Sequence, residues 1–321
     1  MHSSHRSGRR GEEDEDTART AGPEGAGPCS ASHARLERAT VVAPSARPAG
    51  QHRTKGAADT MRVNTTKQKL DAGHVVFGGI VSGFAPELVE MLALIGYDFV
   101  FLDCEHGPMG YDQVEQMVRA AEASGITPIA RIPDHQDATI LRYLDRGVQG
   151  IIVPHVNTAE DARRVAAAAR YFPEGHRGAA SGRAHDYNVH AGRVETMRWQ
   201  NEHTLVIPMC EETTAVANLE AILAVPGIDV VHTASNDLGQ SMGNPPPSEV
   251  RRVMIDVVQR VRRAGKHAGV GGTSPSDASG VADLIAAGAT FVTVSALGLF
   301  RLGAEQFRSQ VQAAVAAKGS N

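Results

Sequence analysis

The chain has 321 residues, with 32 Lys and Arg against 36 Asp and Glu and a formal net charge of −4. This slightly acidic balance gives no reason to expect a nucleic-acid partner. No apolar run approaches the roughly 18 residues of a membrane-spanning helix, so we expect no membrane partner. Cys29, Cys104 and Cys210 lie far apart, which excludes a CxxC pair and fits a reducing, cytoplasmic compartment.

Residues 1–60 are expected to form a disordered tail, because they are rich in Arg, Glu, Gly, Ala, Ser and Pro and carry few strong hydrophobes. They contain no apolar segment typical of a secretory signal, and the acidic run Glu12–Asp16 argues against a transit peptide. The alternative is an over-extended start, since Met61 immediately precedes the part that looks folded. We therefore divide the chain into a tail, residues 1–60, and one domain, residues 61–321, that should be active without the tail.

From Val75 onward, short apolar runs alternate with amphipathic stretches. The predicted strands are Val75–Val81, Phe99–Leu102, Thr127–Arg131, Gly150–Val153, Leu205–Met209, Val230–Thr233, Ala268–Val270 and Phe291–Val294. The predicted helices are Pro86–Ile95, Gln113–Ala123, Ala138–Arg146, Ala159–Tyr171, Ala215–Val225, Ser248–Ala264, Ala278–Ala287 and Leu297–Ala317. Eight such repeats predict an α/β fold, a (β/α)8 TIM barrel. A doubly wound open sheet is the rival, but no Gly-x-Gly-x-x-Gly follows the first strand.

One connection, between Tyr171 and His203, is much longer than the others and is predicted to be a loop. It contains four glycines, and several Arg and His residues lie in its first half. Long loops inside compact barrels are usually functional, and this one would leave the barrel after the fourth strand.

Polar side chains gather just past the predicted strand ends, where barrel enzymes carry their active sites. They are Glu105 and His106 after the second strand, Arg131 at the end of the third, Glu211 and Glu212 after the fifth, and Asp237 after the sixth. An unpaired Arg131 at the barrel mouth would suit a carboxylate or a keto acid. The alternatives are helix caps for the acids and a surface salt bridge for the arginine.

Glu211 and Asp237 are 26 residues apart, about one strand–helix unit, so they should project from neighbouring strands. Two carboxylates with room for water and substrate suit Mg²⁺ or Mn²⁺ better than a closed zinc site.

Taken together, these motifs resemble the HpcH/HpaI aldolase family, the metal-dependent class II pyruvate aldolases, from about Val76 to about Phe300. The resemblance rests on six segments in the same order: Leu102–Gly107, Ala130–Arg131, Tyr143–Pro154, Tyr171–Gly178, Met209–Thr213 and Asn236–Gly243. It implies that Glu211 and Asp237 bind a divalent metal ion, Mg²⁺, Mn²⁺ or Co²⁺. It also implies that Arg131 holds the keto-acid end of the substrate.

The resemblance further implies that His106 pairs with Asp145 as the catalytic base. Backbone amides near Ala234 and Ser235 would receive the substrate carboxylate, together with the metal at Asp237. The chain departs from the family where Met209 replaces a common Gln and where Ala234-Ser235 replaces a usual Gly-Pro, which affects substrate identity more than reaction class.

The expected function is therefore a metal-dependent aldolase that reversibly cleaves a 4-hydroxy-2-oxo acid to pyruvate and an aldehyde. A Schiff-base mechanism is unlikely because Lys266 precedes the seventh strand and the other lysines lie near the chain ends. The alternatives are a citryl- or malyl-CoA lyase of the same superfamily and a non-catalytic barrel that binds a keto acid.

The last predicted helix, Leu297–Ala317, carries large hydrophobes at helical spacing. It could simply close its own barrel. The resemblance implies instead that it exchanges between subunits in a homo-oligomer, a hexamer built as a trimer of dimers.

Overall fold

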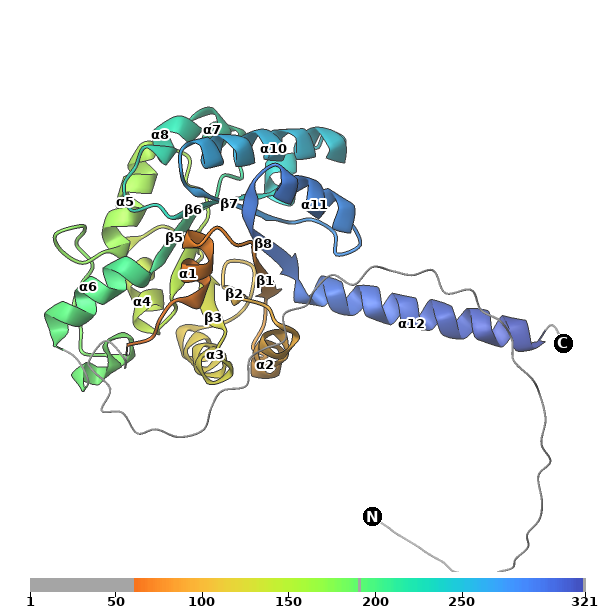
Figure 1. Ribbon diagram of the computed structural model, residues 1–321, viewed down its shortest axis with the longest axis horizontal. Coiled ribbons are helices and arrows are strands. Elements are labelled where there is room, and N and C mark those ends of the chain that lie inside the picture. The colour runs from red at the N-terminus through yellow and green to blue at the C-terminus, as the bar shows by residue number, and fades with distance from the viewer. Residues whose placement is uncertain (1–60, 190–191, 320–321) are drawn as a thin grey trace, which may run out of the picture. The chain divides into compact units, whose positions relative to one another are not determined.

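The computed structural model describes residues 61–189 and 192–319 of the chain. Within them, parallel strands form one sheet in the order β5-β4-β3-β2-β1-β8-β7-β6. Their bounds are β1 (Val76–Val81), β2 (Phe99–Asp103), β3 (Thr127–Arg131), β4 (Gly150–Val153), β5 (Leu205–Pro208), β6 (Val230–Ala234), β7 (His267–Gly271) and β8 (Ala289–Ser295). A parallel bridge between Met209 and His232 brings the edges β5 and β6 together. The predicted (β/α)8 barrel is therefore confirmed (Figure 1).

Helices follow the strands and surround the barrel in Figure 1. Those near predicted positions are α2 (Pro86–Ile95), α3 (Tyr111–Ser124), α4 (Asp137–Asp145), α5 (Ala159–Ala169), α10 (Pro247–Arg263), α11 (Ala278–Ala286) and α12 (Ala296–Gly319). The predicted helix Ala215–Val225 is split into α7 (Thr213–Ala217) and α8 (Leu219–Leu223). Asn218 lies between the two, and its side-chain amide donates to the carbonyl oxygen of Asn157 at 2.9 Å.

The long connection after Tyr171 is not the continuous loop that the sequence suggested. It contains the 3-10 helix η2 (Arg183–Asn188) and the helix α6 (Arg193–His203). The sequence gives little sign of α6 because its few apolar residues form no stripe, and Val194 is exposed. Two further helices, α1 (Thr65–Asp71) and α9 (Ser235–Ser241), were also missed, since seven residues are too few to establish a helical period.

The inside of the barrel is filled by large side chains that point inward from the strands. Phe99 stacks on Phe291 with ring centroids 4.2 Å apart. Glycine at position 78 makes this packing possible, because a Cβ there would lie 2.0 Å from the Phe99 ring. Cys104 and Cys210 are free and buried, as expected of small core residues, and burial raises the pKa of each thiol to about 12.

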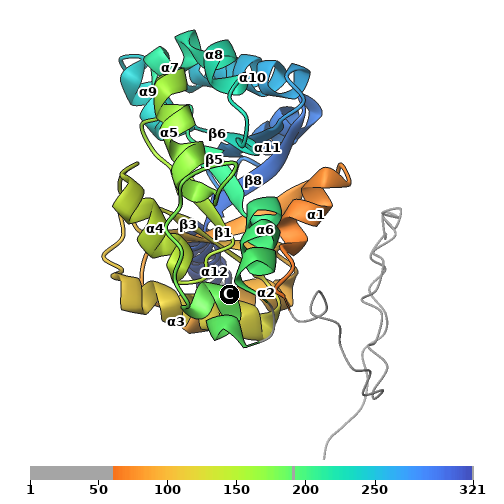
Figure 2. The same ribbon diagram turned by 90° about the vertical axis from the view of Figure 1, so that its left-hand side faces the viewer.

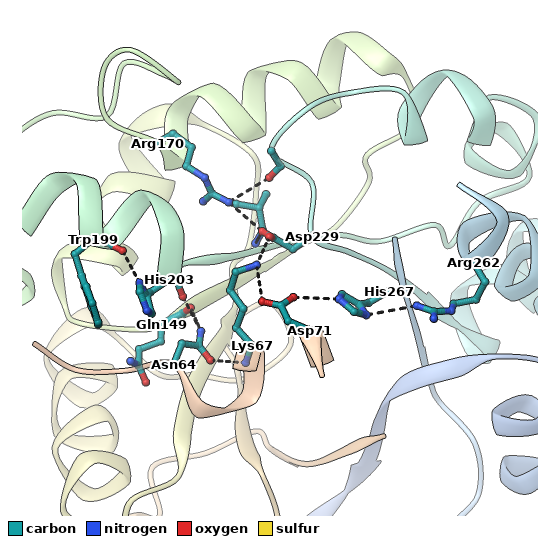
Figure 3. Close-up of polar contacts among 12 residues, drawn as sticks. Asn64, Lys67, Asp71, Gln149, Arg170, Trp199, His203, Asp229, Arg262 and His267 are labelled. Atoms are coloured by element: carbon teal, nitrogen blue, oxygen red, sulfur yellow. Dashed lines mark hydrogen bonds and ion pairs between the residues drawn. The ribbon is translucent and has the colours of Figure 1, made fainter. Parts of the chain in front are cut away.

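Helix α1 closes the N-terminal end of the barrel, where Leu70 joins the buried cluster of the barrel interior. The buried Asn64 caps α1 and donates to the carbonyl oxygens of Gln149 and His203 at 2.9 and 2.8 Å (Figure 3). The ammonium group of Lys67 pairs with Asp229 at 2.8 Å. A segment just before the first strand is thus tied to strands and helices from across the barrel.

Helix α12 leaves the barrel at the end of β8 and extends away from it (Figure 1), so that Figure 2 shows it end-on. Its residues 301–318 are all exposed, and its apolar side chains include Phe300 at 75% and Phe307 at 69% exposure. On the barrel itself, α2 leaves Leu94 and Ile95 exposed as well. The helix therefore does not close its own barrel.

Two further expectations concern the tail and a membrane-spanning helix. The predicted disorder of residues 1–60 lies outside the described residues, as does Cys29. Among the helices of the described ranges, none is both long and apolar enough to cross a membrane.

Candidate active site

The candidate site lies at the C-terminal ends of the strands and is built around Arg131, the last residue of β3. Parallel pairing sets Arg131 opposite Asp103, the last residue of β2. The guanidinium group bonds both oxygens of Asp103, Nε at 3.0 Å and Nη2 at 2.8 Å. Burial alone would raise the pKa of Asp103, but the hydrogen bond and charge of Arg131 outweigh it and lower the pKa. The expectation of an unpaired Arg131 is therefore wrong.

Glu105 lies beside this pair and near two imidazoles. Its Oε2 is 3.2 Å from Nε of Arg131 and 3.9 Å from Nε2 of His106. Its Oε1 is 3.7 Å from Nε2 of His155, which follows β4. The last two distances are longer than hydrogen bonds, and burial raises the pKa of Glu105.

The predicted metal ligands Glu211 and Asp237 come from neighbouring segments, the loop after β5 and the first turn of α9. Glu211 is only 3% exposed, and its carboxylate accepts a hydrogen bond from the backbone N–H of His155 at 3.0 Å. Burial raises its pKa to about 7, and the nearby charges of Asp237 and Glu105 add to the effect. Two close, under-compensated carboxylates are a donor set that fits a divalent cation with hard oxygen ligands.

Within the described part of the chain, no group of three or more His, Cys, Asp or Glu side chains has the geometry of a metal site. A metal held by Glu211 and Asp237 would therefore have two side-chain ligands and keep positions for water and substrate.

His155 is a site residue that the sequence reasoning missed. Its Nδ1 lies 2.8 Å from Oε1 of Glu212, and its backbone has a φ of 56°. The signal was present in the sequence, because His155 follows the buried strand Gly150–Val153 in the same way that His106 follows β2.

Ala234 is the N-cap residue of α9, and Ser235 is its first residue. The backbone N–H groups of a helix's first turn lack intrahelical partners and can donate hydrogen bonds to an anion. Gly272 lies against them: a Cβ at this position would be 2.9 Å from the amide nitrogen of Ser235 and 3.4 Å from that of Asn236. The absence of a side chain at Gly272 keeps these amides accessible.

His106 and Asp145 are not brought together within one chain. Asp145 is the last residue of α4, which returns toward the start of β4, so it lies near the N-terminal end of the barrel. There it pairs with Nη2 of Arg177 at 2.9 Å. His106 is at the opposite end, beside Glu105.

The family model described as HpcH/HpaI aldolase/citrate lyase matches residues 77–299. The chain belongs to the HpcH/HpaI aldolase/citrate lyase family. The family resemblance predicted from the sequence is therefore confirmed, and with it the assignment to a family of lyases.

Among curated relatives in this family, a 2-keto-3-deoxy-L-rhamnonate aldolase of Shigella sonnei is 33% identical, over 74% of this chain and 88% of the relative. The enzyme of the same name from Escherichia coli K12 is 34% identical, over 72% and 86% of the two chains.

Solved structures agree with this assignment. A HpcH/HpaI aldolase/citrate lyase family protein from Burkholderia cenocepacia J2315 is 27% identical, with a TM-score of 0.71, over 78% of this chain and 99% of that one. The citrate synthase SbnG is 30% identical, with a TM-score of 0.67, over 79% and 98%. Similarity to the family thus extends across almost the whole barrel.

Proposed function

We propose that the protein is a divalent-metal-dependent aldolase that reversibly cleaves a 4-hydroxy-2-oxo acid to pyruvate and an aldehyde. The observation that carries this proposal is the buried Glu211 carboxylate, with the half-buried Asp237 and the buried Arg131 nearby, at the strand ends of a HpcH/HpaI barrel. The similarity to 2-keto-3-deoxy-L-rhamnonate aldolases supports a sugar-acid substrate.

Glu211 and Asp237 would hold Mg²⁺, Mn²⁺ or Co²⁺. The bound cation would act as a Lewis acid toward the keto acid and stabilise the negative charge that develops when the carbon–carbon bond breaks. Arg131, kept in place by Asp103, would bind the keto-acid end. The amides at Ala234 and Ser235 would receive the carboxylate.

The proton of the C4 hydroxyl must leave during cleavage, and His106 is the proposed acceptor. Its predicted partner Asp145 lies at the other end of the barrel, so the pair can form only if Asp145 comes from a second copy of the chain. This hypothesis predicts that mixing His106→Ala and Asp145→Ala proteins restores part of the activity that each has lost.

A homo-oligomer is also supported by the exposed apolar side chains of α12 and α2. A helix that leaves its own barrel bare is suited to cover the barrel of another subunit, in the proposed hexamer as a trimer of dimers. Light scattering at micromolar concentration should find an oligomer, and a monomer would contradict the proposal. We further expect a cytoplasmic protein, because Cys104 and Cys210 are free.

The decisive experiment is a screen for pyruvate release from short 4-hydroxy-2-oxo acids. Activity should vanish with EDTA and return when Mg²⁺, Mn²⁺ or Co²⁺ is added. A requirement for a CoA ester would favour the citryl- or malyl-CoA lyase alternative. Binding of a keto acid without turnover of any substrate would favour a non-catalytic barrel.

A further inference from the structure

His155 is held in an unusual backbone conformation at the rim of the site. It lies two residues after the end of β4, with a φ of 56°, in the left-handed region that non-glycine residues seldom adopt. This conformation is unfavourable for a residue with a side chain, because the Cβ lies too close to the backbone. A glycine would avoid that cost, so the histidine side chain itself needs an explanation.

Two bonds fix the residue. Its backbone N–H donates to Oε1 of Glu211 at 3.0 Å, and its Nδ1 lies 2.8 Å from Oε1 of Glu212. A glutamate carboxylate is ionised at neutral pH and can only accept hydrogen bonds. Nδ1 therefore carries the shared hydrogen, and the ring orientation is set.

The other ring nitrogen, Nε2, is left free to bind a ligand. Oε1 of Glu105 lies 3.7 Å from it, which is too long for a hydrogen bond. The side chain is 64% exposed, so a molecule entering the site can reach it. A hydroxyl group both donates and accepts, so it can bond Nε2 whether or not that nitrogen carries a hydrogen.

The charges around the ring restrict what this ligand can be. Glu105, Glu211 and Glu212 all lie within 4 Å of the His155 ring nitrogens. Glu211 would be neutralised by a bound cation, but Glu105 and Glu212 would still face an incoming group. A carboxylate on the distal part of a substrate would be repelled, whereas an uncharged hydroxyl would not.

We propose that His155, positioned by Glu212, is a specificity-determining residue that binds a hydroxyl group on the aldehyde half of the substrate. Glu105 and Glu212 exclude aldehydes that carry a carboxylate. This inference rests on the proposed aldolase function and extends it, because it defines the class of the aldehyde half as neutral and hydroxylated.

The test is aldol addition of pyruvate, with Mn²⁺ present, to three aldehydes: glyceraldehyde, propanal and succinic semialdehyde. They are hydroxylated, apolar and anionic, respectively. In the unaltered protein, kcat/KM should be highest for glyceraldehyde and lowest for succinic semialdehyde. His155→Gly suits the positive φ and keeps the N–H that donates to Glu211. It should reduce the ratio of kcat/KM for glyceraldehyde to that for propanal by about 10-fold, the effect of one lost hydrogen bond.

The matched control is Asn244→Gly, which makes the same backbone change at a φ of 58° beyond the end of α9. It should leave the ratio unchanged. Glu212→Gln can still accept from Nδ1 but lacks the charge, so it should raise kcat/KM for succinic semialdehyde relative to propanal by several-fold.

An unchanged glyceraldehyde-to-propanal ratio in His155→Gly would overturn the inference alone. Equal loss with all three aldehydes would also overturn it, because His155 would then act on the common chemistry or on the fold. If the unaltered protein adds pyruvate to no aldehyde but still decarboxylates oxaloacetate with Mn²⁺, the aldolase proposal fails, and this inference fails with it.

Discussion

At the N-terminal end of the barrel, Asp229 is bonded by Lys67 at 2.8 Å, by Arg170 at 2.9 Å and by the backbone N–H of Val206 at 2.9 Å. At the C-terminal end, Glu211 is more deeply buried, yet it receives one backbone bond and faces further carboxylates. The first arrangement satisfies a half-buried acid with groups of the protein itself. The second leaves negative charge for a cation to neutralise, so one end contributes stability and the other is built for binding.

The largest expected effect follows from neutralising the acids at the C-terminal end. Glu211→Gln or Asp237→Asn should reduce metal-dependent cleavage by at least about 10³-fold, because each removes one of two charged ligands and several kcal/mol of charge stabilisation. Because burial disfavours the charged form of Glu211, Glu211→Gln should also make the metal-free protein more stable above pH 7. Calorimetry with Mn²⁺ and urea unfolding would measure both effects. Unchanged metal affinity would contradict the assignment.

Neutralising Asp229, at the N-terminal end of the barrel, should instead reduce stability and leave the activity unchanged. Asp229→Asn leaves the buried side chain of Arg170 without its carboxylate, which should lower the free energy of unfolding by about 3–5 kcal/mol. Because Asp229 is far from the strand ends that carry the site, kcat/KM per folded molecule should stay the same. A mutant of normal stability and low activity would show that the two ends are not separate in function.

The roles within the site can be separated by comparing two reactions. His106→Ala should reduce aldol cleavage by roughly 10²-fold, because cleavage requires removal of a hydroxyl proton. Decarboxylation of oxaloacetate needs no such proton acceptor and should largely survive. Arg131→Lys, which keeps a cation beside Asp103, should impair both reactions. Parallel losses of both activities in His106→Ala would mean that His106 has a structural role only.

His232 lies in the barrel interior between the two ends, and it should have the smallest of these effects. Burial lowers its pKa to about 3, with a further contribution from the charge of Arg131. Below pH 6.5 the unfolded chain binds a proton that the folded chain does not. The free energy of unfolding should therefore decrease as the pH is lowered below 6.5, by up to about 1.4 kcal/mol per pH unit.

His232→Phe should remove this dependence. Between pH 6.5 and pH 5, the difference in unfolding free energy between mutant and unaltered protein should change by about 2 kcal/mol. The loss of the contact between His232 and Thr293 is the same at both pH values and cancels in the comparison. Parallel stability curves would show that His232 is not kept neutral in the fold.

Much of the fold was predictable because it depends on local patterns. The strands Thr127–Arg131 and Gly150–Val153 and the helix Pro86–Ile95 have the bounds that the sequence predicted. The apolar runs were short and clearly bounded. A buried parallel strand can be recognised from its own run of apolar residues, without knowledge of the strands beside it. The helices α1, α6 and α9 were missed because two are short and the third has no apolar stripe.

The sequence by itself determined the barrel, the family and the side of the sheet on which Arg131, Glu211 and Asp237 lie, because strand order fixes which chain ends meet. Only the tertiary structure decided which of these side chains are partners. It paired Arg131 with Asp103, joined His155 to Glu212, and separated His106 from Asp145 by the length of the barrel. Pairing depends on register and on where each helix ends, and residues 57 positions apart, such as His155 and Glu212, carry no local sign that they touch.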